Sequence, residues 1–123
     1  MADKSRLAEA SLALAHALAF AKKAKSDPFY AAGIAKSFEI CFEYAWKYLK
    51  AVATEHGLEA HSPRDAIKTA ARMGLLDDAE AWLGFLEDRN LSVHDYLGVD
   101  DAGYLQTVKS FRTSVEALLR REP

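Results

Sequence analysis

The 123-residue chain is 50% hydrophobic and 28% charged, a composition that predicts one globular domain spanning residues 1–123 and excludes extensive disorder. Its 16 basic and 18 acidic residues give a formal net charge of −2. This balance argues against a protein that coats nucleic acid through a broad basic face, although it does not exclude a small RNA site.

Cysteine usage and the N-terminal run bear on the compartment. Cys41 is the only cysteine, so neither an intrachain disulfide nor a cysteine-based metal cluster can form, and we expect a buried thiol in a reducing cytoplasm. Polar residues such as Glu9 and His16 interrupt the alanine-rich run at 8–24. We therefore expect a cytoplasmic protein without a membrane span or a cleaved leader.

Helical periodicity dominates the first half of the chain. A thin apolar stripe predicts a first helix that ends near the lysines at 22–25, because cations suit a helix C-terminus. The Ser26-Asp27-Pro28 sequence starts a second helix, which Gly57 ends. The apolar stripe of this second helix consists of Phe38, Phe42, Ala45, Leu49 and Val52.

The second half predicts three more helices. Ser62 before Pro63 is a capping pattern for a third helix, which Gly74 stops. Asp77 with Glu80 marks the start of a fourth. Asp100 or Asp101 can cap a fifth, whose apolar stripe is Leu105, Val108, Phe111, Val115 and Leu118. The expected fold is all-α, an up-and-down bundle of about five helices.

The segment at 88–96 carries the residues best suited to chemistry. Arg89 offers a fork of donors for a phosphate, and His94 can move a proton near neutral pH. Together these two groups suffice for phosphodiester cleavage without a metal. Asn90 lies four residues before His94, so it shares a helix face with the imidazole and could orient it or contact substrate. Tyr96 adds a hydroxyl that a partner could modify.

Helix geometry limits how Arg89 and His94 can meet. Five residues apart, they point about 140° from each other around an ideal helix axis. Either the helix unwinds or ends near Ser92, or a second copy of the chain supplies one of the two groups. The second arrangement predicts a homodimer.

The motif and the segments before it resemble a known family. The chain contains, in order, segments at 38–50, 62–67 and 74–76, then Trp82 and a segment at 86–91. The Arg-x4-His-x-Tyr sequence begins within the last of these segments, at Arg89. This series, within residues 34–96, is similar to the HEPN superfamily (higher-eukaryote and prokaryote nucleotide-binding domains), in the branch named nucleotidyltransferase substrate-binding proteins. The resemblance implies a HEPN-like helical bundle.

The resemblance also implies an activity and a partner. In similar toxin–antitoxin pairs, the histidine corresponding to His94 acts as general acid or base on a ribose 2′-hydroxyl or a leaving oxygen, and the arginine corresponding to Arg89 stabilises the phosphate. Neither a cofactor nor a metal is expected. A minimal nucleotidyltransferase encoded nearby would add adenylate to Tyr96 and block this endoribonuclease site.

Two other functions remain open. The chain could be a non-catalytic subunit that binds a nucleotide or substrate for a nucleotidyltransferase, or a purely structural dimer module. Acidic residues at 87, 88 and 95 would repel an RNA backbone. The nuclease interpretation therefore needs other cations, for which Lys47, Lys50 and Arg64 are the candidates.

The remaining polar and aromatic residues favour structural roles. Glu43 precedes Lys47 by four residues, the favourable order for a helical ion pair, so a metal site with Glu39 is the weaker interpretation. The scattered histidines have no ligand spacing and are expected at the surface or at caps: His16, His56 and His61. Four aromatic residues are expected in the core or a dimer interface rather than as base-stacking platforms: Tyr44, Trp46, Tyr48 and Trp82.

Overall fold

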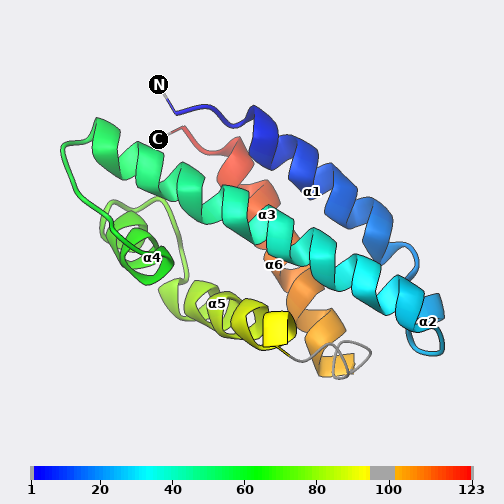
Figure 1. Cartoon of the computed structure of the whole chain (residues 1–123). Helices are drawn as coiled ribbons and strands as arrows, with labels where there is room; N and C mark the ends of the chain where they lie inside the picture. Colours follow the sequence, from blue (N-terminus) through cyan, green and yellow to red (C-terminus); the bar gives the residue numbers. More distant parts are fainter. Residues whose placement is uncertain (1, 95–101, 123) are drawn as a thin grey trace.

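Six helices make up the computed structural model, which describes residues 2–94 and 102–122 (Figure 1). No strand occurs in these described ranges. The helices are α1 (Ser5–Leu18), α2 (Ala21–Ala24), α3 (Pro28–Glu55), α4 (Pro63–Arg72), α5 (Ala79–His94) and α6 (Ala102–Arg120). The prediction of an all-α bundle is confirmed.

The extra helix arises because the first predicted helix is divided in two. α1 ends at Leu18, and Phe20 leaves helical geometry before α2 begins. The ring of Phe20 stacks on Tyr30 of α3 with centroids 5.3 Å apart, so the turn is tied to a neighbouring helix. The prediction that one helix would run on to the lysines at 22–25 is therefore wrong.

The long helix α3 is the centre of the bundle. The Asp27 side chain accepts a hydrogen bond of 3.0 Å from the Phe29 N–H, which caps the helix start. Gly57, at φ 76°, ends the helix, and the Leu58 N–H bonds back to the Ala53 carbonyl. With 28 residues, α3 is about 42 Å long. It packs against α1, α2, α4 and α5.

Local capping also sets the starts of α4 and α5. Ser62 accepts a hydrogen bond of 3.1 Å from the Asp65 N–H, as the capping pattern predicted. Asp78 rather than Asp77 caps α5, because its side chain accepts a 3.0 Å hydrogen bond from the Ala81 N–H. The predicted cap of α6, Asp100 or Asp101, lies outside the described residues.

An aromatic cluster joins α3, α5 and α6. Phe111 of α6 is fully buried and contacts four rings, with centroid distances between 5.2 and 5.8 Å. Those rings are Phe38 and Phe42 of α3 and Trp82 and Phe85 of α5. The cluster fixes α5 against α3, and this contact positions the functional residues on α5.

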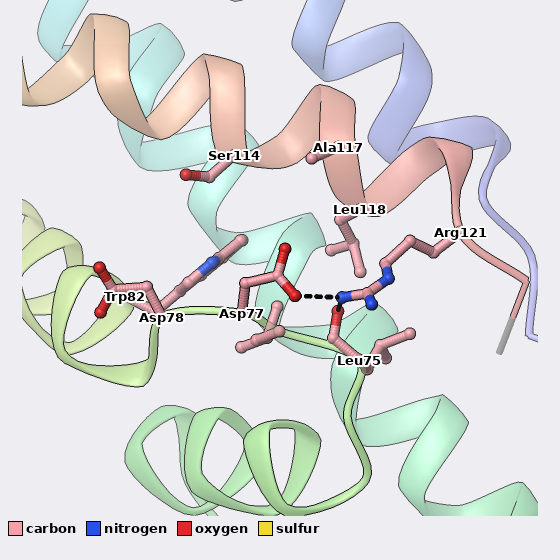
Figure 2. Close-up of a pocket in the computed structure, with 9 residues that line it drawn as sticks. Leu75, Asp77, Asp78, Trp82, Ser114, Ala117, Leu118 and Arg121 are labelled. Carbon is pink, nitrogen blue, oxygen red and sulfur yellow. Dashed lines mark hydrogen bonds and ion pairs between the residues drawn. The ribbon is translucent and has the colours of Figure 1, made fainter.

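The C-terminal segment is tied to two other parts of the bundle. The Lys4 ammonium donates hydrogen bonds to the carbonyls of Leu119 and Arg121, at 3.1 and 2.6 Å. Figure 2 shows Arg121 reaching the loop between α4 and α5, where it bonds to the Leu75 carbonyl and to Asp77. Asp77 therefore anchors this loop to the end of α6 instead of capping α5.

Cys41 is buried as expected, and this burial predicts a pH dependence of stability. Desolvation raises the pKa of the Cys41 thiol from 9.0 to about 12, although the charge of Arg112 opposes the shift. Above pH 9 the unfolded chain ionises this thiol while the folded protein keeps it protonated. We therefore expect this contribution to the free energy of unfolding to be complete below pH 9 and to fall by about 1.4 kcal/mol per pH unit above it.

Other groups titrate in the same range, so a Cys41→Ala variant serves as the reference. Denaturant unfolding of both proteins from pH 7 to 10 measures the difference in slope. The wild-type stability should decline more steeply above pH 9. Equal slopes for the two proteins would contradict the assignment.

Candidate arginine site at the end of α5

The predicted site residues lie on the last turns of α5. Arg89 and Asn90 are described with their side chains, whereas only the backbone of His94 is described. Tyr96 lies outside the described residues. The described part of the site therefore consists of Arg89 and its neighbours.

Contacts with Glu43, Asn90 and Phe42 hold the Arg89 guanidinium. Its Nη2 lies 3.5 Å from Glu43 Oε2 of α3, and its Nη1 donates a 3.1 Å hydrogen bond to Asn90 Oδ1. Its Cζ lies 5.9 Å from the centre of the Phe42 ring, within the range of a cation–π interaction. The Arg89 side chain is 22% exposed. A guanidinium held in this way keeps its orientation at the protein surface.

Glu43 connects this arginine to a tryptophan. The Trp46 Nε1–H donates a 2.6 Å hydrogen bond to Glu43 Oε2, the same oxygen that faces Arg89. Glu43 therefore pairs with Arg89 of α5, and this pairing between helices replaces the expected ion pair with Lys47. The sequence did not reveal Glu43 as a partner of Arg89, because no local spacing relates these two residues. Its spacing of three from Trp46 does place those two side chains on one helix face, and this signal could have predicted their contact.

Of the four aromatic residues expected in the core or an interface, two are buried and two are half-buried. Trp82 and Tyr48 are buried, as expected for core residues. Trp46 and Tyr44 are only half-buried and pack at the edge of the core. Burial raises the pKa of the Tyr48 hydroxyl, with smaller contributions from Glu55 and Glu122.

The three candidate cations lie on two helices. The Lys50 ammonium is 6.0 Å from the centre of the Trp46 ring, and Lys47 is exposed one turn after Glu43 on α3. Arg64 is exposed in the first turn of α4, a helix that carries neither Glu43 nor Arg89. The described contacts thus connect Lys50, through Trp46 and Glu43, to the arginine.

The backbone of α5 decides one of the two geometric alternatives. The helix continues past Ser92 and ends at His94, so it does not unwind between Arg89 and His94, and its end near Ser92 comes too late to separate the two residues. Arg89 and His94 are therefore separated by about 140° around one helix axis. A site that uses both groups needs another contribution, and the supply of one group by a second copy remains as a prediction.

Other candidate sites have little support in the described residues. His16, His56 and His61 are exposed there, as expected. Within the same ranges, no group of three His, Cys, Asp or Glu side chains could hold a metal ion. None of the described helices combines the length and apolar character needed to cross a membrane.

The fold and the site define an all-α bundle in which contacts with a second helix hold an arginine near the end of α5. A family model described as nucleotidyltransferase substrate binding protein like matches residues 3–121, and the chain belongs to this family. The chain is also similar to a Thermus thermophilus protein of known crystal structure, at 31% identity and a TM-score of 0.69. That alignment covers 88% of this chain and 99% of the other. The comparison with curated proteins found no match.

Proposed function

We propose that the protein is the partner of a minimal nucleotidyltransferase encoded nearby and acts in that pair as a metal-independent endoribonuclease toxin. The family match over residues 3–121 supports the nucleotidyltransferase partnership. The nuclease activity is inferred from the Arg89, Asn90 and His94 residues and from their resemblance to the HEPN superfamily.

The observation that carries the nuclease proposal is the fixed orientation of Arg89. Glu43, Asn90 and the Phe42 ring hold the guanidinium before any substrate binds. A preorganised donor stabilises charge on a phosphate more effectively than a mobile one, because less reorganisation is needed during the reaction. Arg89 is thus suited to stabilise the negative charge that develops during phosphodiester cleavage.

His94 completes the proposed mechanism. It removes the proton of a ribose 2′-hydroxyl or protonates the leaving oxygen, and Arg89 stabilises the phosphate between these two positions. Asn90 orients Arg89 through its amide oxygen. Because α5 is helical through both residues, we place the histidine of one chain opposite the arginine of a second chain in a homodimer.

Tyr96 is the proposed point of control, and its hydroxyl gives a direct test of the partnership. We expect incubation with the neighbouring nucleotidyltransferase and ATP to add adenylate to the wild-type chain and to inhibit RNA cleavage, because a bulky anion would block the site. The Tyr96→Phe variant lacks the nucleophilic oxygen, so it should gain no mass and stay active. Intact mass spectrometry and an RNA cleavage assay measure the two effects.

The control for this prediction is Tyr44→Phe, which removes the hydroxyl of a half-buried tyrosine on α3. That variant should be adenylylated like the wild type. Transfer of adenylate to Tyr96→Phe at the wild-type rate would assign the modification to another residue.

A second candidate function is a non-catalytic subunit that binds a nucleotide or substrate for the nucleotidyltransferase. The Glu43 carboxylate favours it, because its pairing with Arg89 offsets positive charge that an RNA phosphate would need. Under this function, the chain would bind nucleotide in calorimetric titrations and leave RNA intact. Under the nuclease function, cleavage would persist in the presence of a chelator and require His94.

A further inference from the structure

We propose that Trp46 is a stacking platform for a nucleobase of single-stranded RNA, located beside Arg89. This inference rests on the proposed nuclease function and names the part of the substrate that the site recognises. It reverses the expectation that the tryptophans serve only the core or an interface.

The two tryptophans of the chain have different environments. Trp82 is 3% exposed and lies in the aromatic cluster around Phe111. Trp46 is half-buried, and its ring lies on the side of α3 that carries Glu43 and Lys50. An indole that is partly accessible can offer its surface to a base, whereas the buried one cannot.

Hydrogen bonding holds the indole in a defined position relative to the arginine. Glu43 Oε2 accepts the Trp46 Nε1–H at 2.6 Å and lies 3.5 Å from Arg89 Nη2. The two nitrogens are therefore at most 6.1 Å apart, the sum of those distances. The sugar of one nucleotide spans such a separation, so a base on Trp46 would place its own or a neighbouring phosphate at Arg89.

Three cations on α3 and α5 can contact a nucleic-acid strand near the indole. They are Arg89, Lys47 and Lys50, and the carboxylates of Glu43, Glu87 and Asp88 oppose them. The Lys50 ammonium is 6.0 Å from the indole centre, close enough to contact a phosphate of a base stacked there. Glu43 acts in this arrangement as a positioning residue, because it contacts both the platform and the guanidinium.

Equilibrium binding of a labelled single-stranded RNA oligonucleotide tests the proposal, with His94→Ala as the parent protein so that the RNA stays intact. Trp46→Leu in this parent should raise Kd roughly 5- to 150-fold, the range for loss of one base–aromatic stack. Trp46→Phe keeps an aromatic face and should cause a smaller increase. The matched control is Phe29→Leu, which removes an exposed aromatic ring from the start of α3 and should leave Kd unchanged.

Two further readouts separate stacking from a structural role. Lys50→Ala should reduce the slope of log Kd against log salt by about 0.7, whereas Trp46→Leu should leave that slope unchanged. RNA should quench the tryptophan emission of the parent but not that of the Trp46→Phe variant, which retains only buried Trp82. In the cleavage-competent protein, Trp46→Leu should raise KM and largely preserve kcat.

The opposite results distinguish this inference from the function on which it rests. If the parent binds RNA and Trp46→Leu binds it equally well, the platform is overturned and the nuclease proposal stands. If Trp46→Leu loses the dimer in light scattering, the indole belongs to an interface, which also overturns the platform. If the parent binds no RNA and the wild type cleaves none, both proposals fall.

Discussion

An equimolar mixture of Arg89→Ala and His94→Ala chains, refolded together so that dimers exchange partners, is expected to recover about one quarter of wild-type RNA cleavage. Each variant alone should be reduced by about 10²- to 10⁴-fold, the usual effect of losing a catalytic acid or base or a charge-stabilising donor. Recovery follows from the helical backbone of α5, which separates the two side chains by about 140° within one chain.

The recovered fraction of activity depends on which chain supplies the arginine and which supplies the histidine of each site. Half of the randomly paired dimers contain one chain of each kind, and one of their two sites then combines an intact arginine with an intact histidine. If both groups came from the same chain, no mixed dimer would hold a complete site and the mixture would stay inactive. A mixture of Arg89→Ala with the double variant is the control, because it lacks a complete site in either arrangement.

Phe111→Ala is expected to destabilise the protein by about 3 to 5 kcal/mol, the range for removing a buried aromatic side chain. Phe111 is fully buried, and it contacts two rings of α3 and two rings of α5. Its loss would leave a cavity where these three helices meet. Because a domain of this size is stable by only about 5 to 15 kcal/mol, the effect is a large part of the total. Guanidinium unfolding followed by circular dichroism measures it.

The matched comparison is Phe29→Ala, which also removes a phenyl ring. Phe29 is 76% exposed at the start of α3, so its replacement should change the free energy of unfolding by no more than about 0.5 kcal/mol. Equal effects of the two substitutions would show that the aromatic cluster does not hold the bundle together.

Local signals in the sequence were sufficient for most helix boundaries. Asp27 and Ser62 accept backbone hydrogen bonds as their positions before proline predict, and Gly57 and Gly74 adopt the positive φ that ends a helix. The break at Phe20 was not predicted. There the Phe20 ring stacks on Tyr30 of α3, a contact between helices that no periodicity within the first helix reveals.

The candidate site was only partly predictable for the same reason. Arg89 and Asn90 are neighbours in the sequence, and their contact follows from the α5 helix. Glu43 belongs to another helix and reaches Arg89 only because the aromatic cluster packs α5 against α3. The role of His94 and the modification of Tyr96 stay predictions, since neither side chain belongs to the described part of the structure.

Cleavage of a panel of labelled RNAs in excess chelator tests the central claim most directly, after intact mass has excluded adenylate on Tyr96. The wild-type chain should cleave, His94→Ala should not, and His56→Ala, which alters an exposed histidine at the end of α3, should cleave like the wild type. Equal cleavage by the wild type and His94→Ala, or no cleavage by either, would contradict a metal-independent nuclease that uses His94.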